Sequence, residues 1–285
     1  MQTQELEKIA SQVRRDILRM VHGCQSGHPG GSLGCTDLLV ELFFNAMNLA
    51  TDSLGNVIFQ MDGHGEDVFY LSNGHISPLI YSVLARRGYF PVAEMSSFRK
   101  INTRLQGHPT PHEHLEGIRI ASGSLGQGLS VAIGTAQAKK LAKDQSIVYC
   151  LMGDGEQNEG QVWEAAMYAP HHQVDNLIAF IDVNGQQIDG PTTKVMNNRD
   201  LGEKYKAFGW EVLLMNGNNA ADVQETIVKA KELSGKGSPI MVLMQTEMGA
   251  GVDFMMGSHK WHGVAPNDQQ LADALAQLTE TLGDY

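Results

Sequence analysis

The stretch Ser146–Pro191 constrains the fold more than any other part of this chain. Two short runs within it, Ile147–Met152 and Leu177–Val183, are rich in the β-branched and aromatic residues that favour strands. The segment between them, roughly residues 158–168, has helical character. A strand, a helix and a second strand in this order predict two parallel neighbours in one sheet.

Polar residues follow each of these runs. Gly-Asp-Gly (residues 153–155) follows the first, and Asn-Gly-Gln (residues 184–186) follows the second. The carboxyl ends of parallel strands meet at one edge, where open α/β sheets bind ligands. A glycine turn leading into a helix favours an anion, but the Asp154 carboxylate would repel phosphate unless a cation lay between them. The Asp154 carboxylate, the Asn184 side-chain oxygen and the Gln186 backbone carbonyl are the oxygens that Mg²⁺ accepts.

Two other interpretations compete for these turns. Gly-Asp-Gly alone is common and is often only a solvated turn, so the prediction depends on the paired turn after the second strand. A dinucleotide fingerprint fits poorly, because the third glycine of that pattern would fall on Asn158.

The rest of the chain alternates between helical and strand patterns. Further strands are predicted at 67–72, 210–215 and 239–244, and helices at 5–22, 36–47, 78–87, 93–100, 128–143, 199–208, 222–233 and 267–282. Residues 22–34 are a glycine-dense loop, and 102–117 and 246–262 are long loops. This order predicts a single α/β domain over residues 1–285, with a doubly wound, mostly parallel sheet and helices on both faces.

Bulk composition excludes several classes of partner. The net charge of −11 disfavours nucleic acid and anionic membrane surfaces. There is no run of apolar residues long enough to span a bilayer, and the amino-terminal segment is charged throughout, unlike a signal peptide. Three cysteines without ligand spacing indicate free thiols, so we expect a cytoplasmic protein.

Several of the 11 histidines lie in glycine-containing loops at predicted strand ends. These are His28, His75, His108, His259 and His262. Histidines facing hydroxyl and carbonyl groups suit general acid–base work, although any one alone is more often structural. Zinc is disfavoured, because His112 and His114 are only two residues apart and have no cysteine or HExxH partner.

Six segments together resemble the transketolase family. SGHPGGSLG, LSNGH, QGHP, GSLGQG, the GDG…N pair and SHKWHG occur in the family's order between about residues 26 and 265. The resemblance implies a thiamine-diphosphate-binding fold. It also implies that the chain binds thiamine diphosphate through Mg²⁺, with Ca²⁺ or Mn²⁺ as substitutes.

The resemblance also assigns residues. The catalytic set it implies is His28, His75, His108, His262, His259 and Glu159. The cofactor-binding set is His75, Gly123, Ser124, Leu125, Gly153, Asp154, Gly155, Glu156, Asn184, Gln186, Met248 and His262, with Asp154, Asn184 and Gln186 as metal ligands. Glu159 and Glu164 match acidic residues that the family places near a subunit interface, although a solvated helix face would explain Glu164 as well.

The chain departs from the family in sequence and in length. Ser124 stands where the family usually has proline, and GNVIFQMDGHGEDVF replaces the usual Asp- and Arg-rich segment before LSNGH. Family members are generally more than twice as long, with a pyrimidine-binding domain and a third C-terminal domain. The resemblance therefore implies the N-terminal subunit of a split transketolase. We expect it to be active only with a C-terminal partner that supplies both domains, as an α2β2 heterotetramer.

The implied reaction transfers a two-carbon ketol unit from a ketose or ketose phosphate to an aldose or aldose phosphate. The sugars themselves cannot be inferred, because recognition of their head groups would lie mostly on the partner. Three alternatives stay open. These are the α-type subunit of a 2-oxo acid dehydrogenase, a deoxyxylulose-phosphate synthase, and a non-catalytic paralogue that binds the cofactor or a partner. SGHPGGSLG, QGHP and GSLGQG weigh against the first.

Overall fold

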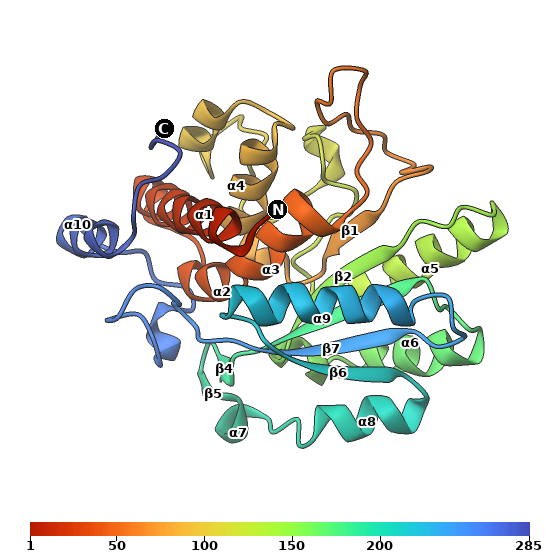
Figure 1. The fold of residues 1–285 in the computed structure, drawn as a ribbon. Helices are drawn as coiled ribbons and strands as arrows, with labels where there is room; N and C mark the ends of the chain where they lie inside the picture. The colour runs from red at the N-terminus through yellow and green to blue at the C-terminus, as the bar shows by residue number, and fades with distance from the viewer.

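The computed structural model describes residues 1–285 and is built around a five-stranded parallel sheet (Figure 1). The strands lie in the order β1-β2-β3-β7-β6. Their bounds are β1 Val68–Leu71, β2 Val148–Gly153, β3 Leu177–Val183, β6 Glu211–Asn216 and β7 Ile240–Gln245. Every strand predicted from the sequence is present, within one or two residues at each end, and the predicted parallel α/β class is confirmed.

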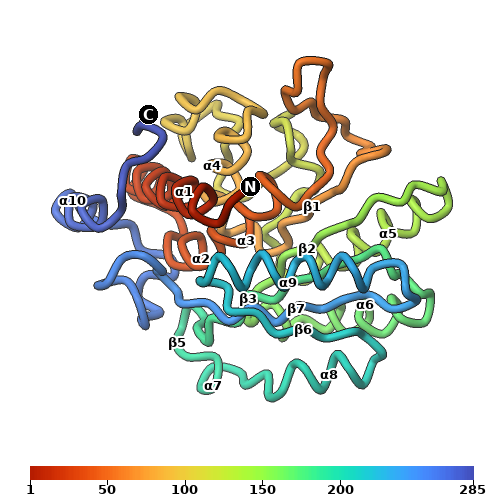
Figure 2. Tube along the Cα trace, in the orientation of Figure 1, coloured from red at the N-terminus to blue at the C-terminus, as the bar shows by residue number.

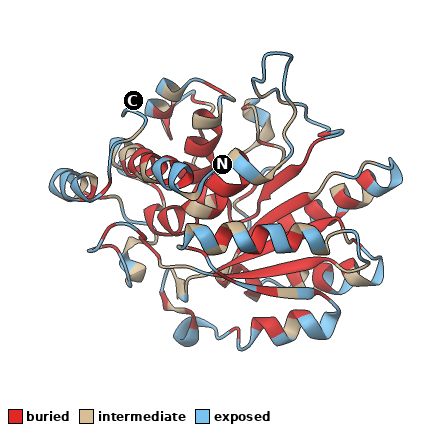
Figure 3. Ribbon diagram, in the orientation of Figure 1, coloured by how far each residue is buried: buried red, intermediate tan, exposed pale blue.

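The central strands are apolar along most of their length because both of their faces are covered. In β2, Tyr149 and Leu151 face one core while Cys150 and Met152 face the other. Figure 3 shows these strands as the most buried part of the molecule. The edge strand β6 instead alternates, with Leu213 and Met215 buried and Leu214 exposed.

Helices cover the two faces unequally. One face carries α1 Thr3–Cys24, α2 Pro29–Gly34, α3 Thr36–Glu41, α4 Ser77–Arg87 and α9 Ala220–Leu233, and its core contains 46 buried residues. The other face carries α5 Gly128–Leu141, α6 Gly160–His171 and α8 Leu201–Phe208 around a core of 22. A last helix, α10 Asp268–Gln277, packs outside α1. The tube in Figure 2 traces the same layers along the backbone.

The strand order is not the chain order. The chain passes from β3 through α8 to the edge strand β6, and then returns through α9 to β7, which lies between β3 and β6. Side-chain caps fix the starts of these crossover helices. Asp200 accepts the Glu203 N–H at α8, and Asn219 accepts the Asp222 N–H at α9.

The structure corrects four details of the sequence prediction. Residues 29–34, predicted as loop, form the buried helix α2 with Pro29 in its first turn. The helix predicted over 36–47 changes into a π-helical turn, η1 Leu42–Ala46, and the one over 93–100 is the 3₁₀ helix η3 Val92–Ser97. The closing helix stops at Gln277 rather than Leu282.

Short elements complete the chain between these helices and strands. They are the 3₁₀ turns η2 Gly74–Ile76, η4 Pro111–Glu113, η5 Gly155–Asn158 and η6 His259–Trp261, the hairpin β4 Gln186–Gln187 with β5 Gly190–Pro191, and α7 Thr192–Val195. No helix combines the length and the apolar character needed to cross a bilayer.

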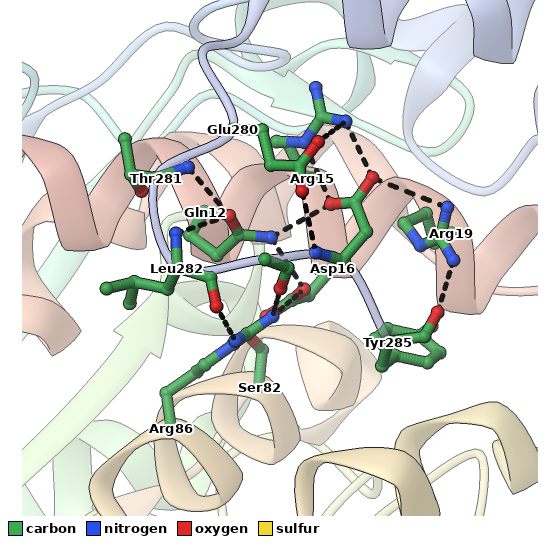
Figure 4. Close-up of polar contacts among 12 residues, drawn as sticks. Gln12, Arg15, Asp16, Arg19, Ser82, Arg86, Glu280, Thr281, Leu282 and Tyr285 are labelled. Atoms are coloured by element: carbon green, nitrogen blue, oxygen red, sulfur yellow. Dashed lines mark hydrogen bonds and ion pairs between the residues drawn. The ribbon is translucent and has the colours of Figure 1, made fainter.

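The closing helix stops early because the last residues cross α1 instead. Residues 279–285, here called the tail segment, lie along α1 and reach α4 (Figure 4). The side-chain oxygen Oε1 of Gln12 accepts the N–H groups of Thr281 and Leu282, both at 3.0 Å. The Arg15 guanidinium donates to both carboxylate oxygens of Asp284, and Arg86 donates to the Gly283 carbonyl at 2.9 Å. Backbone and side-chain contacts together hold the tail segment in place.

Candidate functional site

A cavity of about 390 Å³ lies at the carboxyl ends of β1, β2 and β3. Its walls come from the start of α2, the turn after β1, the turn before α5, the turns after β2 and β3, and the loop that holds His262. The lining residues are His28, Gly31, Asn73, His75, Gly123, Leu125, Gly153–Glu156, Asn158, Glu159, Asp182, Asn184, Gln187, Ile188 and His262. The predicted sheet edge is therefore a concave site.

The turns after β2 and β3 meet at Asp154, as the sequence predicts. Asp154 is 4% exposed, and its two carboxylate oxygens accept the N–H groups of Gly155 at 2.7 Å and Gly185 at 2.9 Å. The Thr192 hydroxyl lies 3.3 Å from the same carboxylate. Parallel register brings these turns together, because Gly153 pairs with Asp182 across the two strands.

A second buried carboxylate, Asp182, lies beside Asp154. It accepts the Asn184 side-chain N–H at 2.8 Å and the Thr246 hydroxyl. Burial and the neighbouring negative charge of Asp182 raise the pKa of Asp154 to about 7. Neither carboxylate forms an ion pair with a lysine or an arginine. Sequence reasoning missed Asp182, although a lone acid near the end of an apolar run was a usable signal.

The oxygens around Asp154 suit a hard cation rather than a soft one. No three His, Cys, Asp or Glu side chains are grouped so that they could hold a metal ion, so any ligand set here needs amide or backbone oxygens. Asn184 supplies a side-chain oxygen that accepts the Gln186 N–H at 2.9 Å, and the Gln186 side-chain oxygen is buried without a partner. Uncompensated carboxylates with neutral oxygens beside them fit Mg²⁺ or Ca²⁺.

Glu156 joins the ends of β1 and β2 to the turn before α5. Its carboxylate accepts the N–H groups of Gly126 at 2.7 Å and Gly153 at 3.0 Å, together with the Ser72 hydroxyl. The Ser72 oxygen in turn accepts the Gly128 N–H at 2.9 Å. Burial raises the pKa of Glu156. The residue is 1% exposed, so it acts mainly as a junction that sets the shape of the cavity.

Three histidines from distant parts of the chain form a cluster on the opposite wall. Ring centroids are 5.1 Å apart for His28 and His75, 5.3 Å for His75 and His262, and 5.7 Å for His28 and His262. Burial, followed by the charge of neighbouring histidines, lowers the pKa of His28 to about 4 and of His75 to about 3. Burial also lowers the pKa of His262. All three imidazoles are therefore neutral near pH 7.

Neutral imidazoles can both donate and accept a hydrogen bond. The Nδ1 atoms of His28 and His262 are buried and have no partner in the protein. Buried polar atoms normally find one, so these nitrogens are available to a polar ligand in the cavity.

The other two histidines named from the sequence lie further out. His108 is exposed and packs against Gly123, where an added Cβ would come within 2.6 Å of the imidazole. The pKa of His108 is lowered by burial and by Arg99. His259 begins η6 and borders a separate groove with Ile188 and Lys260. The structure thus brings His28, His75 and His262 together and leaves His259 outside the cavity.

The remaining assigned residues fall into two groups. Gly123, Leu125, Gly153, Gly155 and Glu159 line the cavity. Ser124 is exposed outside it, and Met248 is 1% exposed beneath α2, where an added Cβ on Gly30 would lie 2.5 Å from its side chain. Glu164 lies on the exposed side of α6, in a groove shared with α5.

Comparison with known proteins gives consistent matches. A family described as "Transketolase, thiamine diphosphate binding domain" matches residues 6–283. The chain is 34% identical over 282 residues to one subunit of the apulose-4-phosphate transketolase of Phocaeicola vulgatus, covering 99% of this chain and 96% of the relative. It is 35% identical over 274 residues to one subunit of a 6-deoxy-6-sulfo-D-fructose transketolase from a Clostridium species, covering 96% of each.

Solved structures give the same match over a smaller share of their length. The transketolase of Campylobacter jejuni superposes with a TM-score of 0.87 at 30% identity. The match covers 98% of this chain and 43% of that protein. The chain thus spans less than half the length of the transketolases whose structures it matches.

Proposed function

The chain belongs to the transketolase family, a family of transferases, and on that premise we propose that it is the thiamine-diphosphate-binding, N-terminal subunit of a split transketolase. One observation carries this proposal. The chain covers 96% of a relative that is named as a single subunit of a transketolase, but only 43% of a solved transketolase chain. We propose that residues 1–285 act as one domain and that a second chain supplies what the longer proteins hold in their remaining length.

In this proposal the turns after β2 and β3 hold the diphosphate end of the cofactor. Asp154, the Asn184 side-chain oxygen and the Gln186 backbone carbonyl would bind Mg²⁺, or Ca²⁺ or Mn²⁺ in its place. The uncompensated charge of Asp154 and Asp182 supports this assignment. The cation would neutralise these carboxylates and present a positive charge to the diphosphate. Bound thiamine diphosphate supplies the nucleophilic carbon and the electron sink that ketol transfer requires.

The histidine cluster would handle the protons of the sugar. His28, His75 and His262 are neutral near pH 7, so each can accept a proton from a hydroxyl or donate one to a developing alkoxide. Their unpaired Nδ1 atoms, at His28 and His262, support a ligand on this wall. His108 would close the outer side of the sugar channel, by which we mean the part of the cavity beside His28, His75 and His262. His259 would support His262. Gly123, Ser124, Leu125 and Met248 would shape the apolar surroundings of the ring.

The partner would be a C-terminal subunit with the pyrimidine-binding and C-terminal domains, assembled with this chain as α2β2. Glu159 immediately precedes α6 and lines the cavity, and Glu164 lies exposed in the first part of the helix. We propose that both face the interface and couple the two cofactor sites. The donor would be a ketose or ketose phosphate, and the relatives are named for apulose-4-phosphate and for 6-deoxy-6-sulfo-D-fructose.

Reconstitution tests this proposal. The purified chain alone is expected to show no ketol transfer, and addition of the C-terminal subunit should restore it in the presence of Mg²⁺ and thiamine diphosphate. Production of aldose from a panel of ketose phosphates and sulfonated ketoses measures the reaction. Full activity of the single chain would contradict the split assembly. Decarboxylation of a 2-oxo acid without ketol transfer would favour the dehydrogenase-type alternative.

A further inference from the structure

Arg99 connects the two loops that carry His28 and His108. Its guanidinium donates from Nη1 to the Ser26 hydroxyl at 2.8 Å and from Nη2 to the Gly107 carbonyl at 3.4 Å. Ser26 stands two residues before His28, and Gly107 stands immediately before His108. One side chain therefore touches both segments, although they are far apart in the sequence.

The backbone around Arg99 is shaped for this contact. Arg99 has φ = 57°, in the left-handed region that non-glycine residues seldom adopt, and its N–H donates to the Leu105 carbonyl at 2.9 Å. The guanidinium packs against Gly107 so closely that an added Cβ there would lie 2.8 Å from Cζ and 2.9 Å from Nε. Arginine and glycine at these two positions therefore depend on each other.

Helix α4 holds the same segment from the other side. The Ser77 hydroxyl donates to the Gly107 carbonyl at 2.8 Å, and the Tyr81 hydroxyl donates to the Gln106 carbonyl at 2.8 Å. Of the three side chains that bond to residues 106–107, Arg99 is the one that also bonds to Ser26. Without Arg99, this pair of hydrogen bonds between the Ser26 segment and the Gly107 segment would be lost.

The charge on Arg99 has no acidic partner. The arginine forms no ion pair, and its Nε atom is buried without a hydrogen bond. By contrast, Arg104 in the same loop pairs with Glu94 and Glu116. The positive charge of Arg99 acts on the imidazoles of His28 and His108. It lowers the pKa of both.

We propose that Arg99 is a positioning residue of the sugar channel, which holds the His28 and His108 loops together and places a fixed positive charge beside both imidazoles. The catalytic consequence rests on the proposed function, whereas the effect on the two histidines does not. The pKa of His28 responds to His75, His262 and His108 as well as to Arg99. For His108, Arg99 is the one charged neighbour with a marked effect.

Two substitutions separate the geometric role from the charge. Arg99→Met removes the hydrogen bonds and the charge, while Arg99→Lys keeps the charge but loses the forked contact. In the reconstituted enzyme, both should lower kcat by about tenfold or more, because displaced catalytic groups lose rate steeply. Loss of the charge raises the pKa of both histidines. The acid limb of the pH–kcat profile should therefore move to higher pH by about half a unit in Arg99→Met alone.

The control is Arg104→Met, which removes an arginine of the same loop that pairs with surface acids. It should leave kcat and the acid limb unchanged. Thiamine diphosphate affinity should stay within about twofold of wild type in all three variants, because the Asp154 turn is a separate part of the cavity. A wild-type kcat and acid limb in Arg99→Met would overturn the proposal, as would an equal loss in Arg104→Met.

A measurement on the single chain keeps this test independent of the reaction. Histidine imidazole titration by NMR should show a higher pKa for His108 in Arg99→Met and an unchanged one in Arg99→Lys. Absence of that rise would overturn the charge role even if the reconstituted pair catalysed nothing. If Arg99→Met failed to fold, Ser26→Ala would test the loop link, with a lower kcat and an unshifted acid limb expected.

Discussion

Two buried polar clusters in this molecule differ in how their charges are balanced. In the cluster around the tail segment, Asp16 pairs with Arg86 at 2.8 Å, and Asp284 pairs with Arg15 at 2.6 Å. In the cluster at the strand ends, Asp154 and Asp182 lie side by side, and neither forms an ion pair with a lysine or an arginine. Both clusters are built largely from buried side chains, but only the first is neutralised from within the chain.

The difference distinguishes a structural cluster from a binding site. A buried charge must be paired or neutralised, because leaving it alone in a low-dielectric interior is costly. The tail cluster satisfies this requirement with its own arginines and therefore needs no ligand. The strand-end cluster has no such partner for its two carboxylates, so an added cation would stabilise their negative charge. Unpaired buried charge of this kind is typical of a functional site.

The largest expected effect comes from removing the imbalance itself. Asp154→Ala should lower thiamine diphosphate affinity in the reconstituted enzyme by about a thousandfold, because the proposed metal bridge would be lost. The same change removes the acceptor of the Gly155 and Gly185 N–H groups but also relieves the repulsion from Asp182, so the free energy of unfolding of the single chain should change by less than about 1 kcal/mol. Titration calorimetry and urea unfolding measure these two quantities.

The matched control for that variant is Asp189→Ala, an exposed carboxylate in the β4–β5 hairpin that follows the turn after β3. Its cofactor affinity should equal that of wild type. Unchanged affinity in Asp154→Ala would show that the metal assignment is wrong.

Removing a cation from the tail cluster should lower the stability of the chain and leave cofactor affinity unchanged. Arg86→Met leaves Asp16, which is fully buried, without its cation, and we expect a loss of about 3 kcal/mol in the free energy of unfolding. Cofactor affinity in the folded, reconstituted enzyme should not change. Adding Asp16→Leu to Arg86→Met should recover part of the loss in urea unfolding, and no recovery would argue against charge imbalance as its cause.

Acid should affect the histidine cluster of the cavity and the tail cluster in separate pH ranges. His28 and His75 have folded pKa values of about 4 and 3, below the unfolded value of about 6.5, so the unfolded state binds more protons in between. Stability should therefore fall by up to about 1.4 kcal/mol per pH unit for each histidine as the pH drops below 6.5. The pKa of Asp284 is lowered to about 2, so its contribution is lost only below about pH 4.

Unfolding free energies measured between pH 7 and 4 test this separation. A variant with both His28→Gln and His75→Gln should show a flatter dependence over that range, whereas His112→Gln, at an exposed position, should follow wild type. An equally steep fall in the double variant would assign the acid sensitivity to other groups.

The smallest expected effect concerns the partly exposed edge of the tail cluster. Asp284→Asn removes a bidentate pair with Arg15 and should destabilise the chain by about 1 kcal/mol, since water screens the pair in part. Glu280→Gln alters a longer, more exposed contact with the same arginine and should have almost no effect. Equal losses in thermal unfolding of the two variants would contradict this ranking.

The sequence predicted those features that depend on local pattern. Apolar runs located all five strands, and the polar residues after β2 and β3 located the sheet edge where Asp154 meets the Asn184 turn. Helix α2 was missed because its three glycines are typical of a loop, and only burial between α1 and α4 makes that segment helical.

Features that depend on distant contacts could not be predicted from pattern alone. Individual loop histidines suggested acid–base chemistry, but the contact of His28, His75 and His262 follows from how three separate loops fold over the sheet edge. Asp182 was hidden inside its strand, and nothing around Arg99 in the sequence indicates that its guanidinium reaches Ser26.

The position of β7 has a consequence for the order of folding. Because β7 lies between β3 and β6 but follows both in the chain, neither strand has its final neighbour until residues 240–245 arrive. During synthesis, two strands with open edges must wait through the whole of α9, and open edges readily pair with other chains. The moment at which β7 inserts therefore completes the sheet and ends the interval in which the newly made chain is most exposed to aggregation.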